Sequence, residues 1–351
     1  MLLLRQISFH IRMKLHFLSE NKTIEEQILF FLEEWNNNLM HFTTMTSGST
    51  GTPKIIEIDK QFARNSALAT INYLGLSKGD TALLSLNPQT IGGKMMIVRS
   101  IEHELELYII EPSSNPLKNL DQTFDFLSFA PIQLHTILTG NPEKLKGVKA
   151  IIIGGGVIGE ESISLLKQYK LTVFQTFGMT ETISHIALRK VGFETEDFYQ
   201  TIDGITVSSK NEQLIIHAPG LGHTDLETND RVEIINERTF KWLGRTDFVI
   251  NSGGVKIQIE QLENELQGLI QAPFFIHSIP DERLGEQVVL LVEGTKKDNY
   301  LRKSFYLQLS NPYFIPKKIA FIENFTRTLS DKINRKATFT TIDKTLLEEI
   351  L

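Results

Sequence analysis

The feature that most constrains this chain is a regular alternation of apolar runs and helical patterns between about residues 80 and 175. Several runs have the length and the β-branched or aromatic content of buried strands. They lie at 82–86, 106–110, 126–129, 148–153 and 171–175. Helical patterns lie between or beside them, at 95–102, from Pro131 onward and at 159–169. Strands that alternate with helices in this way predict a mainly parallel sheet covered by helices, and therefore an α/β fold.

Two further helices are predicted ahead of this region. Thr23 and Glu26 have the spacing of a capping box, so we expect a helix over 24–36 with its apolar residues at helical spacing. A second helical pattern covers 59–74. These helices extend the set that can cover the predicted sheet.

The pattern changes after about residue 202. Short alternating runs such as 213–216 and 231–235 predict antiparallel strands. A smaller α+β unit then follows. We therefore expect two domains, an N-terminal domain of residues 1–244 and a C-terminal domain of residues 245–351.

The composition excludes several classes of protein. A net charge of −6 argues against a broad basic surface for nucleic acid. The chain has no cysteine, which excludes a disulfide framework, a thiolate metal site and a cysteine nucleophile, so any thiol acceptor must come from another molecule. No apolar run approaches the ~18 residues of a membrane span, and residues 1–30 show no signal-peptide pattern. Translation is expected to start at Met1 or at Met13. We expect a cytoplasmic protein.

A cluster of glycines, hydroxyls and a lysine has the chemistry of an anion site. Glycines let backbone amides turn toward a phosphate, hydroxyls donate further hydrogen bonds, and lysine adds positive charge. The cluster comprises Thr46, Ser47, Gly48, Ser49, Thr50, Gly51, Thr52, Pro53 and Lys54. Its spacing is not that of a Walker A loop, and the alternative is a flexible linker. Because linkers rarely join two β-prone runs, here 42–45 and 54–58, we favour a phosphate cradle.

This cluster resembles the phosphate loop of the adenylate-forming superfamily of acyl-CoA synthetases, luciferases and peptide-synthetase adenylation domains. The signature T-S-G-S-T-G-x-P-K is matched at every specified position. The resemblance implies a large N-terminal α/β domain, here with a shortened leading part, and a small mobile C-terminal α+β domain that carries a catalytic lysine. It also implies ATP and Mg²⁺ as cofactors.

Two further motifs resemble the adenine- and metal-binding segments of this superfamily. The run Gln175-Thr176-Phe177-Gly178-Met179-Thr180-Glu181-Thr182 resembles Y-G-x-T-E, with a phenylalanine for the usual tyrosine. The resemblance implies that Phe177 stacks on adenine, that Thr180 contacts the α-phosphate and that Glu181 holds Mg²⁺. The turn Gly154-Gly155-Gly156 resembles one that lies against adenine. Taken alone, the first run could equally be a helix-capping turn, and the glycine turn is better explained as a plain strand-to-helix turn.

A third pair of motifs resembles the ribose-binding and hinge segments. These are Thr228-Asn229-Asp230, against T-G-D, and Gly244-Arg245-Thr246-Asp247, against G-R-x-D. The resemblance implies that Asp230 binds the ribose hydroxyls with the help of Arg245, and that the small domain rotates about Asp247. Asn229 replaces glycine, and we expect the turn to survive because asparagine tolerates left-handed backbone.

Two motifs in the C-terminal domain complete the set. Ser252-Gly253-Gly254 resembles a segment that leaves room for the pantetheine arm of coenzyme A, and the alternative is an ordinary β-hairpin. The run from Thr326 to Arg335 resembles P-R-T-x-x-G-K-I-x-R, with Asp331 in place of glycine. The resemblance implies that Lys332 is catalytic, although a lysine in such a charged run is usually solvated.

The early position of the phosphate loop is most familiar among 2-succinylbenzoate–CoA ligases of menaquinone synthesis. Ile91-Gly92-Gly93 with Arg99, and the run from Gln175 to His185, resemble segments of that group. The resemblance implies an acid with two carboxylates, one of which needs a binding partner while the other reacts. Arg99, His185 and Lys94 are the candidates by charge. Alternatively, Arg99 caps a helix and His185 lies in the core.

The expected reaction is therefore the ATP-dependent activation of an acid followed by transfer to coenzyme A, with small molecules as the only expected partners. Two other functions stay open: an adenylation module that loads a separate carrier protein, and a degenerate nucleotide-binding protein without turnover. The retained Thr180, Glu181, Asp230, Arg245 and Lys332 argue against the second. The sequence leaves the oligomeric state open, a homo-oligomer included.

Overall fold

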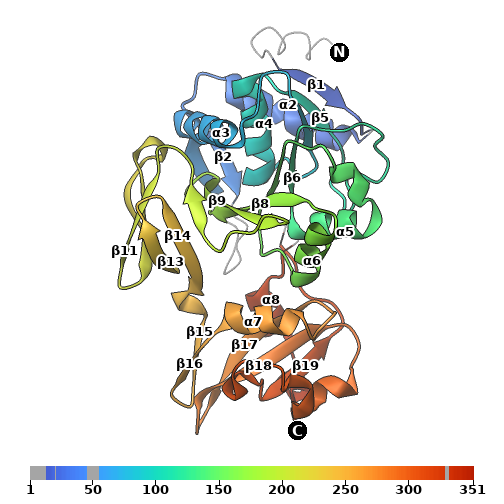
Figure 1. Cartoon of the computed structure of the whole chain (residues 1–351), viewed down its shortest axis with the longest axis vertical. Coiled ribbons are helices and arrows are strands. Elements are labelled where there is room, and N and C mark those ends of the chain that lie inside the picture. Colours follow the sequence, from blue (N-terminus) through green and yellow to red (C-terminus); the bar gives the residue numbers. More distant parts are fainter. Residues whose placement is uncertain (1–12, 20, 46–54, 329–331) are drawn as a thin grey trace.

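The computed structural model describes residues 13–19, 21–45, 55–328 and 332–351. The predicted phosphate loop at 46–54 and Asp331 lie outside these ranges. The described chain forms a large sheet, a small sheet and a two-stranded ribbon. Figure 1 shows the small sheet and its helices as a lower body beneath the large sheet. Among the described residues, no helix is long and apolar enough to cross a membrane.

One half of the large sheet is parallel, as the alternating pattern predicts. In spatial order its strands are β1 (Lys14–Phe17), β5 (Glu106–Ile109), β4 (Thr81–Leu84), β6 (Phe126–Phe129), β7 (Ala150–Ile153) and β8 (Thr172–Gly178). Each strand pairs in parallel with its neighbour. The predicted α/β fold class is confirmed.

Helices cover both faces of this parallel half, which explains why its strands are continuous apolar runs. One face carries α2 (Lys22–Asn36), α3 (Lys60–Leu74) and α4 (Ile91–His103), and the other carries α5 (Pro131–Gly140) and α6 (Glu160–Gln168). Successive strand residues point to opposite faces. Thus Ala150 and Ile152 of β7 pack into the first core, and Ile151 and Ile153 into the second.

The other half of the large sheet is antiparallel from the β8–β9 pair onward. Its strands are, in spatial order, β9 (His185–Gly192), β10 (Tyr199–Thr201), β14 (Thr239–Arg245), β13 (His223–Asn236), β12 (Gln213–Ala218) and β11 (Thr206–Lys210). The predicted strands at 213–216 and 231–235 fall within β12 and β13. The ribbon of β2 (His41–Met45) and β3 (Ile55–Asp59) is also antiparallel.

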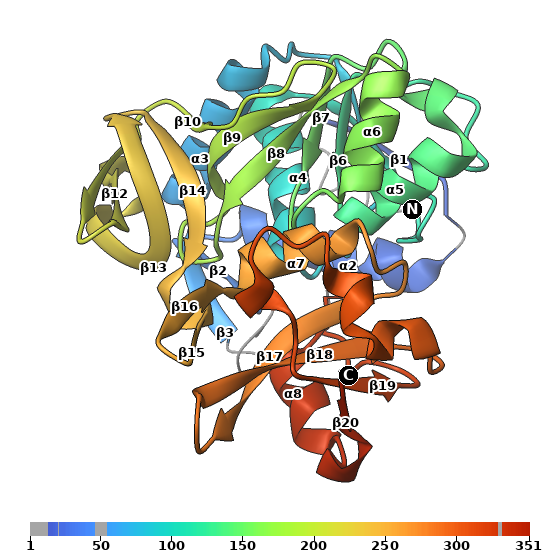
Figure 2. The ribbon, with the colours of Figure 1, turned by 60° about the horizontal axis from the view of Figure 1, so that its bottom comes forward.

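The small sheet begins after Arg245, where β14 ends. It consists of β16 (Val255–Gln258), β15 (Val249–Ser252), β18 (Gly285–Glu293), β19 (Lys318–Ile322) and β20 (Glu348–Glu349), with β17 (Phe274–Asp281) paired to β18. Its helices are α7 (Ile259–Gln267) and α8 (Arg335–Thr341). The turn η3 (Thr246–Phe248) joins the two sheets. In Figures 1 and 2, α7 lies on the side of the small sheet that faces the large one.

Short 3-10 turns make several of the remaining connections. They are η1 (Pro142–Leu145), η2 (Pro219–Leu221), η4 (Asp298–Leu301), η5 (Lys303–Tyr306), η6 (Pro312–Phe314) and η7 (Lys344–Leu346).

Apolar residues of α7, such as Leu262 and Leu266, pack with Ile250 and Ile257 of the small sheet. The small sheet therefore has a core of its own.

Two helices begin earlier than the sequence patterns predict. The capping box expected at Thr23 and Glu26 is wrong, because the side chain of Asn21 caps α2 by accepting a hydrogen bond from the amide of Thr23 at 3.0 Å. Helix α4 begins at Ile91 rather than at Met95, because the side chain of Thr90 caps it just ahead of Ile91. Polar side chains just ahead of each helix satisfy its first amides and so set its start.

Gly93 lets the first turn of α4 pack directly on the preceding turn. A Cβ atom at Gly93 would lie 2.8 Å from Pro88 Cα, and backbone cannot move aside as a side chain can. We expect Gly93→Ala to lower the free energy of unfolding of the large sheet by about 1–3 kcal/mol. Urea unfolding monitored by the fluorescence of Trp35 and Trp242, both in this part of the chain, measures the change.

Gly92→Ala is the matched control. A Cβ atom there would meet only the Leu86 side chain at 3.4 Å and the Thr90 hydroxyl at 4.0 Å. It should therefore unfold close to the parent protein. Equal unfolding midpoints for the two variants would contradict the role of Gly93.

Candidate active site

The predicted nucleotide-binding residues gather where the parallel strands β7 and β8 end. Ile153 pairs with Gln175, so the turn at 154–156 and the end of β8 are neighbours. The side chain of Gln175 donates a hydrogen bond to the carbonyl of Gly156 at 3.4 Å and accepts one from Arg189 at 2.5 Å. The structure therefore brings these two predicted segments together at the carboxyl edge of the sheet, where ligands bind in open α/β folds.

The turn after β8 is held by the buried hydroxyl of Thr182. This hydroxyl accepts a hydrogen bond from the amide of Met179 at 3.0 Å, and it lies 2.8 Å from the carbonyl of Ser184. The turn leaves Glu181 exposed and Thr180 half-buried. Thr182 is thus a positioning residue for both predicted catalytic groups, a role that the sequence analysis missed.

The same turn has strained backbone and an anchor from another strand. Ile183 has a φ of 68°, in the left-handed region that a β-branched residue rarely adopts. His223, at the start of β13, donates a hydrogen bond from Nε2 to the carbonyl of Glu181 at 2.8 Å. Such strain persists only where surrounding contacts impose it, and it is concentrated at functional sites.

Phe177 lies on an aromatic base. Its ring is 5.4 Å from Tyr199 and 5.2 Å from Phe240, between ring centres, and Tyr199 and Phe240 are both buried. The Phe177 ring itself is only half-buried. The packing fixes the ring while leaving part of it accessible, as stacking on a flat ligand requires.

Asp230 and Arg245 face each other across the pair β13–β14. Asp230 is buried, it accepts a hydrogen bond from the indole Nε1 of Trp242 at 2.8 Å, and its carboxylate is 3.8 Å from Arg245 Nη1. Trp242 was also missed; it pairs with Val232, two positions along β13 from Asp230, and a register shift in β14 separates it from Arg245 by three positions. Its hydrogen bond to Asp230 shows that the two side chains lie on the same face. Asn229 lies inside β13 without a positive φ, so the left-handed turn considered for it does not form.

Lys332 reaches the large sheet from the small one. A Cβ atom at Gly155 would lie 3.2 Å from Lys332 Cε and 3.7 Å from its Nζ, and Gly155 has a φ of 85°. Burial lowers the pKa of the Lys332 ammonium below its ordinary value. The backbone amide of Lys332 donates a hydrogen bond to the Thr328 hydroxyl at 3.2 Å, which holds the lysine at this position. The structure thus places the predicted catalytic lysine against the predicted adenine turn.

Strands and turns carry or flank the other predicted segments. Met45 pairs with Ile55, so the predicted phosphate loop between them is flanked by neighbouring strands. The predicted hinge residue Asp247 lies in the connection η3. Gly253 and Gly254 form the turn between β15 and β16, with positive φ values, and the amide of Gly253 donates to the carbonyl of Leu284 at 2.8 Å. Lys332, rather than this turn, contacts Gly155.

Arg99 and His185, two of the three acid-binding candidates, meet beneath the turn after β8. Arg99 is buried and donates a hydrogen bond to the Ser184 hydroxyl at 2.8 Å, while its Nε has no partner in the described structure. Within that part of the chain no carboxylate pairs with it, and burial lowers its pKa to about 10. Buried His185 lies 3.0 Å from the Thr70 hydroxyl, and burial together with Arg99 lowers its pKa well below the ordinary value.

Lys94, the third candidate, is engaged elsewhere. Its ammonium donates to the carbonyl of Thr43 at 2.6 Å and lies 3.5 Å from the carboxylate of Glu34. It also lies over the rings of Phe31 and Phe42. These contacts join α4 to α2 and β2, and they leave Arg99 as the better candidate for an anionic ligand.

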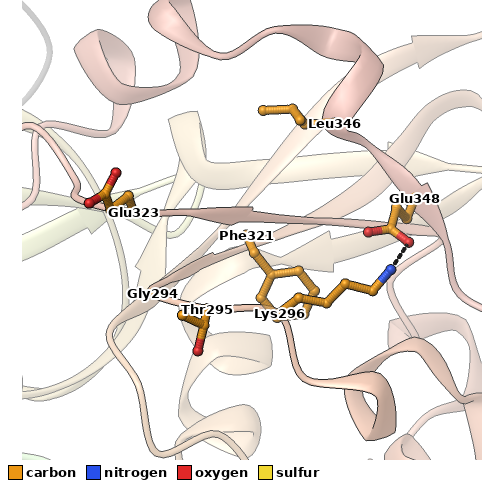
Figure 3. A pocket seen from close by; sticks show the side chains of 7 residues that line it. All are labelled: Gly294, Thr295, Lys296, Phe321, Glu323, Leu346 and Glu348. Carbon is orange, nitrogen blue, oxygen red and sulfur yellow. Dashed lines mark hydrogen bonds and ion pairs between the residues drawn. The ribbon is translucent and has the colours of Figure 1, made fainter.

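A cavity of about 380 Å³ lies in the small-sheet part of the chain, as Figure 3 shows. It is lined by Phe321 and by the ion pair of Lys296 with Glu348 at 2.5 Å, among others. None of the predicted site residues lines it. The candidate active site is therefore defined by its converging side chains and not by this cavity.

The arrangement agrees with comparisons of the sequence with known proteins. Curated relatives include the 2-succinylbenzoate–CoA ligase of Listeria monocytogenes serotype 4b, which is 26% identical over 87% of this chain and 70% of its own length. The corresponding enzyme of Lactococcus lactis is 23% identical over 83% of this chain and 69% of its own length.

Solved structures of similar fold agree with this. An AMP-forming acyl-CoA synthetase/AMP-acid ligase II-like protein from Dyadobacter fermentans is 34% identical, covers 92% of this chain and 95% of its own, and superposes with a TM-score of 0.61. The o-succinylbenzoate CoA synthetase of Bacillus subtilis with the acyl-adenylate OSB-AMP has a TM-score of 0.71 at 18% identity, over 93% of this chain and 78% of its own, and shows the shared fold. Residues 20–216, more than half of the chain, match the AMP-binding enzyme family. The chain belongs to that family.

Proposed function

We propose that this protein is an ATP-dependent acid–CoA ligase that works through an acyl-adenylate, and that its acid is 2-succinylbenzoate. The observation that carries the proposal is the contact of Lys332 with the turn at Gly155, which brings a partly buried ammonium from one sheet to the nucleotide edge of the other. The names of the curated relatives support the choice of acid. The substrates ATP and coenzyme A fit a cytoplasmic enzyme.

The nucleotide would lie along the carboxyl edge of β7 and β8. In this proposal Phe177 stacks on the adenine beside Gly154 and Gly156, and Asp230 accepts hydrogen bonds from the ribose hydroxyls. Trp242 orients the Asp230 carboxylate, because its indole Nε1 donates a hydrogen bond to one of the two carboxylate oxygens. Thr180 then lies near the α-phosphate, at the turn that Thr182 holds. The triphosphate would extend toward residues 46–54.

Glu181 is the residue that would hold Mg²⁺. Its carboxylate is exposed at the end of β8, and carboxylate oxygens together with phosphate oxygens suit this cation. Bound there, the cation would neutralise phosphate charge. The hydrogen bond from His223 to the carbonyl of Glu181 fixes the backbone at this point.

The first half-reaction joins the acid to AMP. A substrate carboxylate oxygen attacks the α-phosphorus, the bond to the bridging oxygen breaks, and pyrophosphate leaves. Negative charge develops between the attacking carboxylate and the phosphate, and the Lys332 ammonium stabilises it. Preorganised charge in a site of low water content stabilises a transition state more strongly than the same charge in water.

In the second half-reaction the coenzyme A sulfur attacks the acyl carbonyl and AMP leaves. We propose that the small sheet and its helices, the part of the chain after Asp247, turn about that residue, withdraw Lys332 and bring the 252–254 turn toward the site. The two glycines of that turn lack side chains, which leaves space for a narrow pantetheine arm.

Arg99 supports an acid with a second carboxylate. A buried guanidinium without an acidic partner is costly, and a carboxylate of the ligand would offset that cost. Ser184 and His185 join Arg99 to the turn that presents Thr180 and Glu181. The proposed acid would therefore bind beneath this turn, with one carboxylate at Arg99 and the other at the α-phosphate.

Lys332→Ala should separate the two half-reactions. We expect acyl-adenylate formation, measured as pyrophosphate release, to fall by about 10²–10³, because the developing charge loses its partner. Transfer of the acyl group from preformed acyl-adenylate to coenzyme A should change little. Lys336→Ala, an exposed lysine on α8, is the control and should leave both rates unchanged. Equal loss of both half-reactions in Lys332→Ala would refute this division of roles.

Arg99→Met should weaken binding of the diacid selectively. We expect the KM for 2-succinylbenzoate to rise by about 30-fold or more, since one partner of a buried charge pair is lost, while the KM for ATP stays near its parent value. Turnover of 4-oxo-4-phenylbutanoate, which lacks the ring carboxylate, should be nearly unaffected. Steady-state kinetics with the two acids measure this, and a parallel rise for both acids would rule out the proposed contact.

The activity itself is tested by AMP and pyrophosphate release from ATP and Mg²⁺, with 2-succinylbenzoate and with a panel of fatty and aromatic acids. Coenzyme A-dependent AMP release with 2-succinylbenzoate alone would support both the reaction and the acid. Turnover of a different acid would keep the ligase and discard this substrate. If AMP forms only when a carrier protein is added, the alternative of an adenylation module is favoured.

A further inference from the structure

The connection between the two sheets is anchored to the large sheet as far as Thr246. The hydroxyl of Thr246 donates a hydrogen bond to the carbonyl of Asn229 at 3.2 Å, and it lies 3.5 Å from the side-chain amide of Gln213. The small sheet begins three residues later, at Val249. A rotation of the small sheet must therefore change the backbone between Thr246 and Val249.

Gln258 spans this connection with one buried side chain. It is the last residue of β16 and pairs with Val249, so it belongs to the small sheet. Its Nε2 donates to the carbonyl of Arg245 at 2.8 Å and to the carboxylate of Glu260 at 2.6 Å, and the carbonyl of Phe248 is 3.4 Å away. Arg245 lies on the large-sheet side of the connection, whereas Phe248 and Glu260 lie on the small-sheet side.

Gly244 accommodates this side chain. A Cβ atom at Gly244 would lie 2.6 Å from Gln258 Nε2, 2.8 Å from its Cδ and 2.9 Å from its Cγ. Gly244 also has a φ of 113°, which favours glycine. The end of β14 thus leaves space for the Gln258 side chain. This fit is a second observation, independent of the hydrogen bonds of Gln258.

The helix that follows Gln258 carries this link to the interface between the sheets. Glu260, which accepts from Gln258, lies in the first turn of α7. At the far end of α7, the side-chain oxygen of Gln267 would lie 3.7 Å from a Cβ atom at Gly159, the N-cap of α6. Gln258 therefore holds one end of the helix that faces the large sheet.

We propose that Gln258 is a positioning residue that latches the small sheet in the orientation where Lys332 meets Gly155. Rotation about the connection must break the hydrogen bond from Gln258 to the Arg245 carbonyl, while its contacts with Phe248 and Glu260 move with it. The inference rests on the proposed function, because it assigns this orientation to adenylation. The latch favours adenylation and must open before the thiol step.

The orientation of the two sheets can be measured without any substrate. The chain has no cysteine, so Glu143→Cys and Asn299→Cys, both exposed positions, give one spin label on each part. We expect Gln258→Met, which keeps the length of the side chain but loses its donors, to shift or broaden the label-to-label distance distribution measured by electron spin resonance. Gln261→Met is the matched control, because exposed Gln261 bonds to Glu265 of its own helix.

The half-reactions provide the second readout. Gln258→Met should slow acyl-adenylate formation by roughly 3- to 10-fold, as expected for the loss of one buried hydrogen bond, and should leave thioester formation from preformed acyl-adenylate equal or faster. A merely structural role would slow both steps together. Gly244→Ala is the second variant, for use if Gln258→Met does not fold. It keeps the glutamine in the sequence, but its added Cβ atom displaces the Gln258 side chain, so it should change the two half-reactions in the same direction.

The outcomes separate the latch from the proposed function. A folded Gln258→Met with the distance distribution of the parent and of Gln261→Met overturns the latch, even if the enzyme turns over 2-succinylbenzoate. A shifted distribution supports the latch even where no acid of the panel is activated, and that result would discard the proposed function instead. Equal slowing of both half-reactions in Gln258→Met also overturns the latch.

Discussion

The pairing of β7 with β8 is the constraint on which the rest of the site depends. Because the two strands are parallel, their carboxyl ends lie at the same edge of the sheet, and the glycine turn at 154–156 lies beside the end of β8. Gln175 ties the two segments through the carbonyl of Gly156. The open face of Gly155 then becomes the point where Lys332 can reach the large sheet.

The change from parallel to antiparallel pairing after β8 is a second constraint on the site. The chain must reverse between Gly178 and His185, and it does so through the buried hydroxyl of Thr182 and the left-handed backbone of Ile183. The same reversal exposes Glu181 on one side and returns Ser184 toward Arg99 on the other. One strained turn thus links the proposed nucleotide site to the proposed acid site.

Much of the fold could be predicted because its signals are local. Apolar runs of strand length separated by helical patterns indicate a parallel sheet wherever both faces are covered, and β6 and β7 follow that rule. Helix starts were less predictable: Asn21 and Thr90 cap α2 and α4, since several polar residues near a helix start compete for the same amides. Among the site residues, Trp242 lies in no motif, and Thr182 lies in a motif that gives it no role, because what these two side chains do arises from hydrogen bonds across a turn and between strands.

The sequence by itself determined the fold class, the family and the order of the chemical groups, because glycine turns, hydroxyl runs and strand periodicity are written in neighbouring residues. Only the tertiary structure decided what each charged side chain does. Arg99 and Lys94 lie on the same helix, yet Arg99 is buried without an acid in the described chain and Lys94 is held by Glu34 and Thr43. The pKa and the role of such groups depend on burial and on partners distant in sequence, and these exist only once the chain has folded.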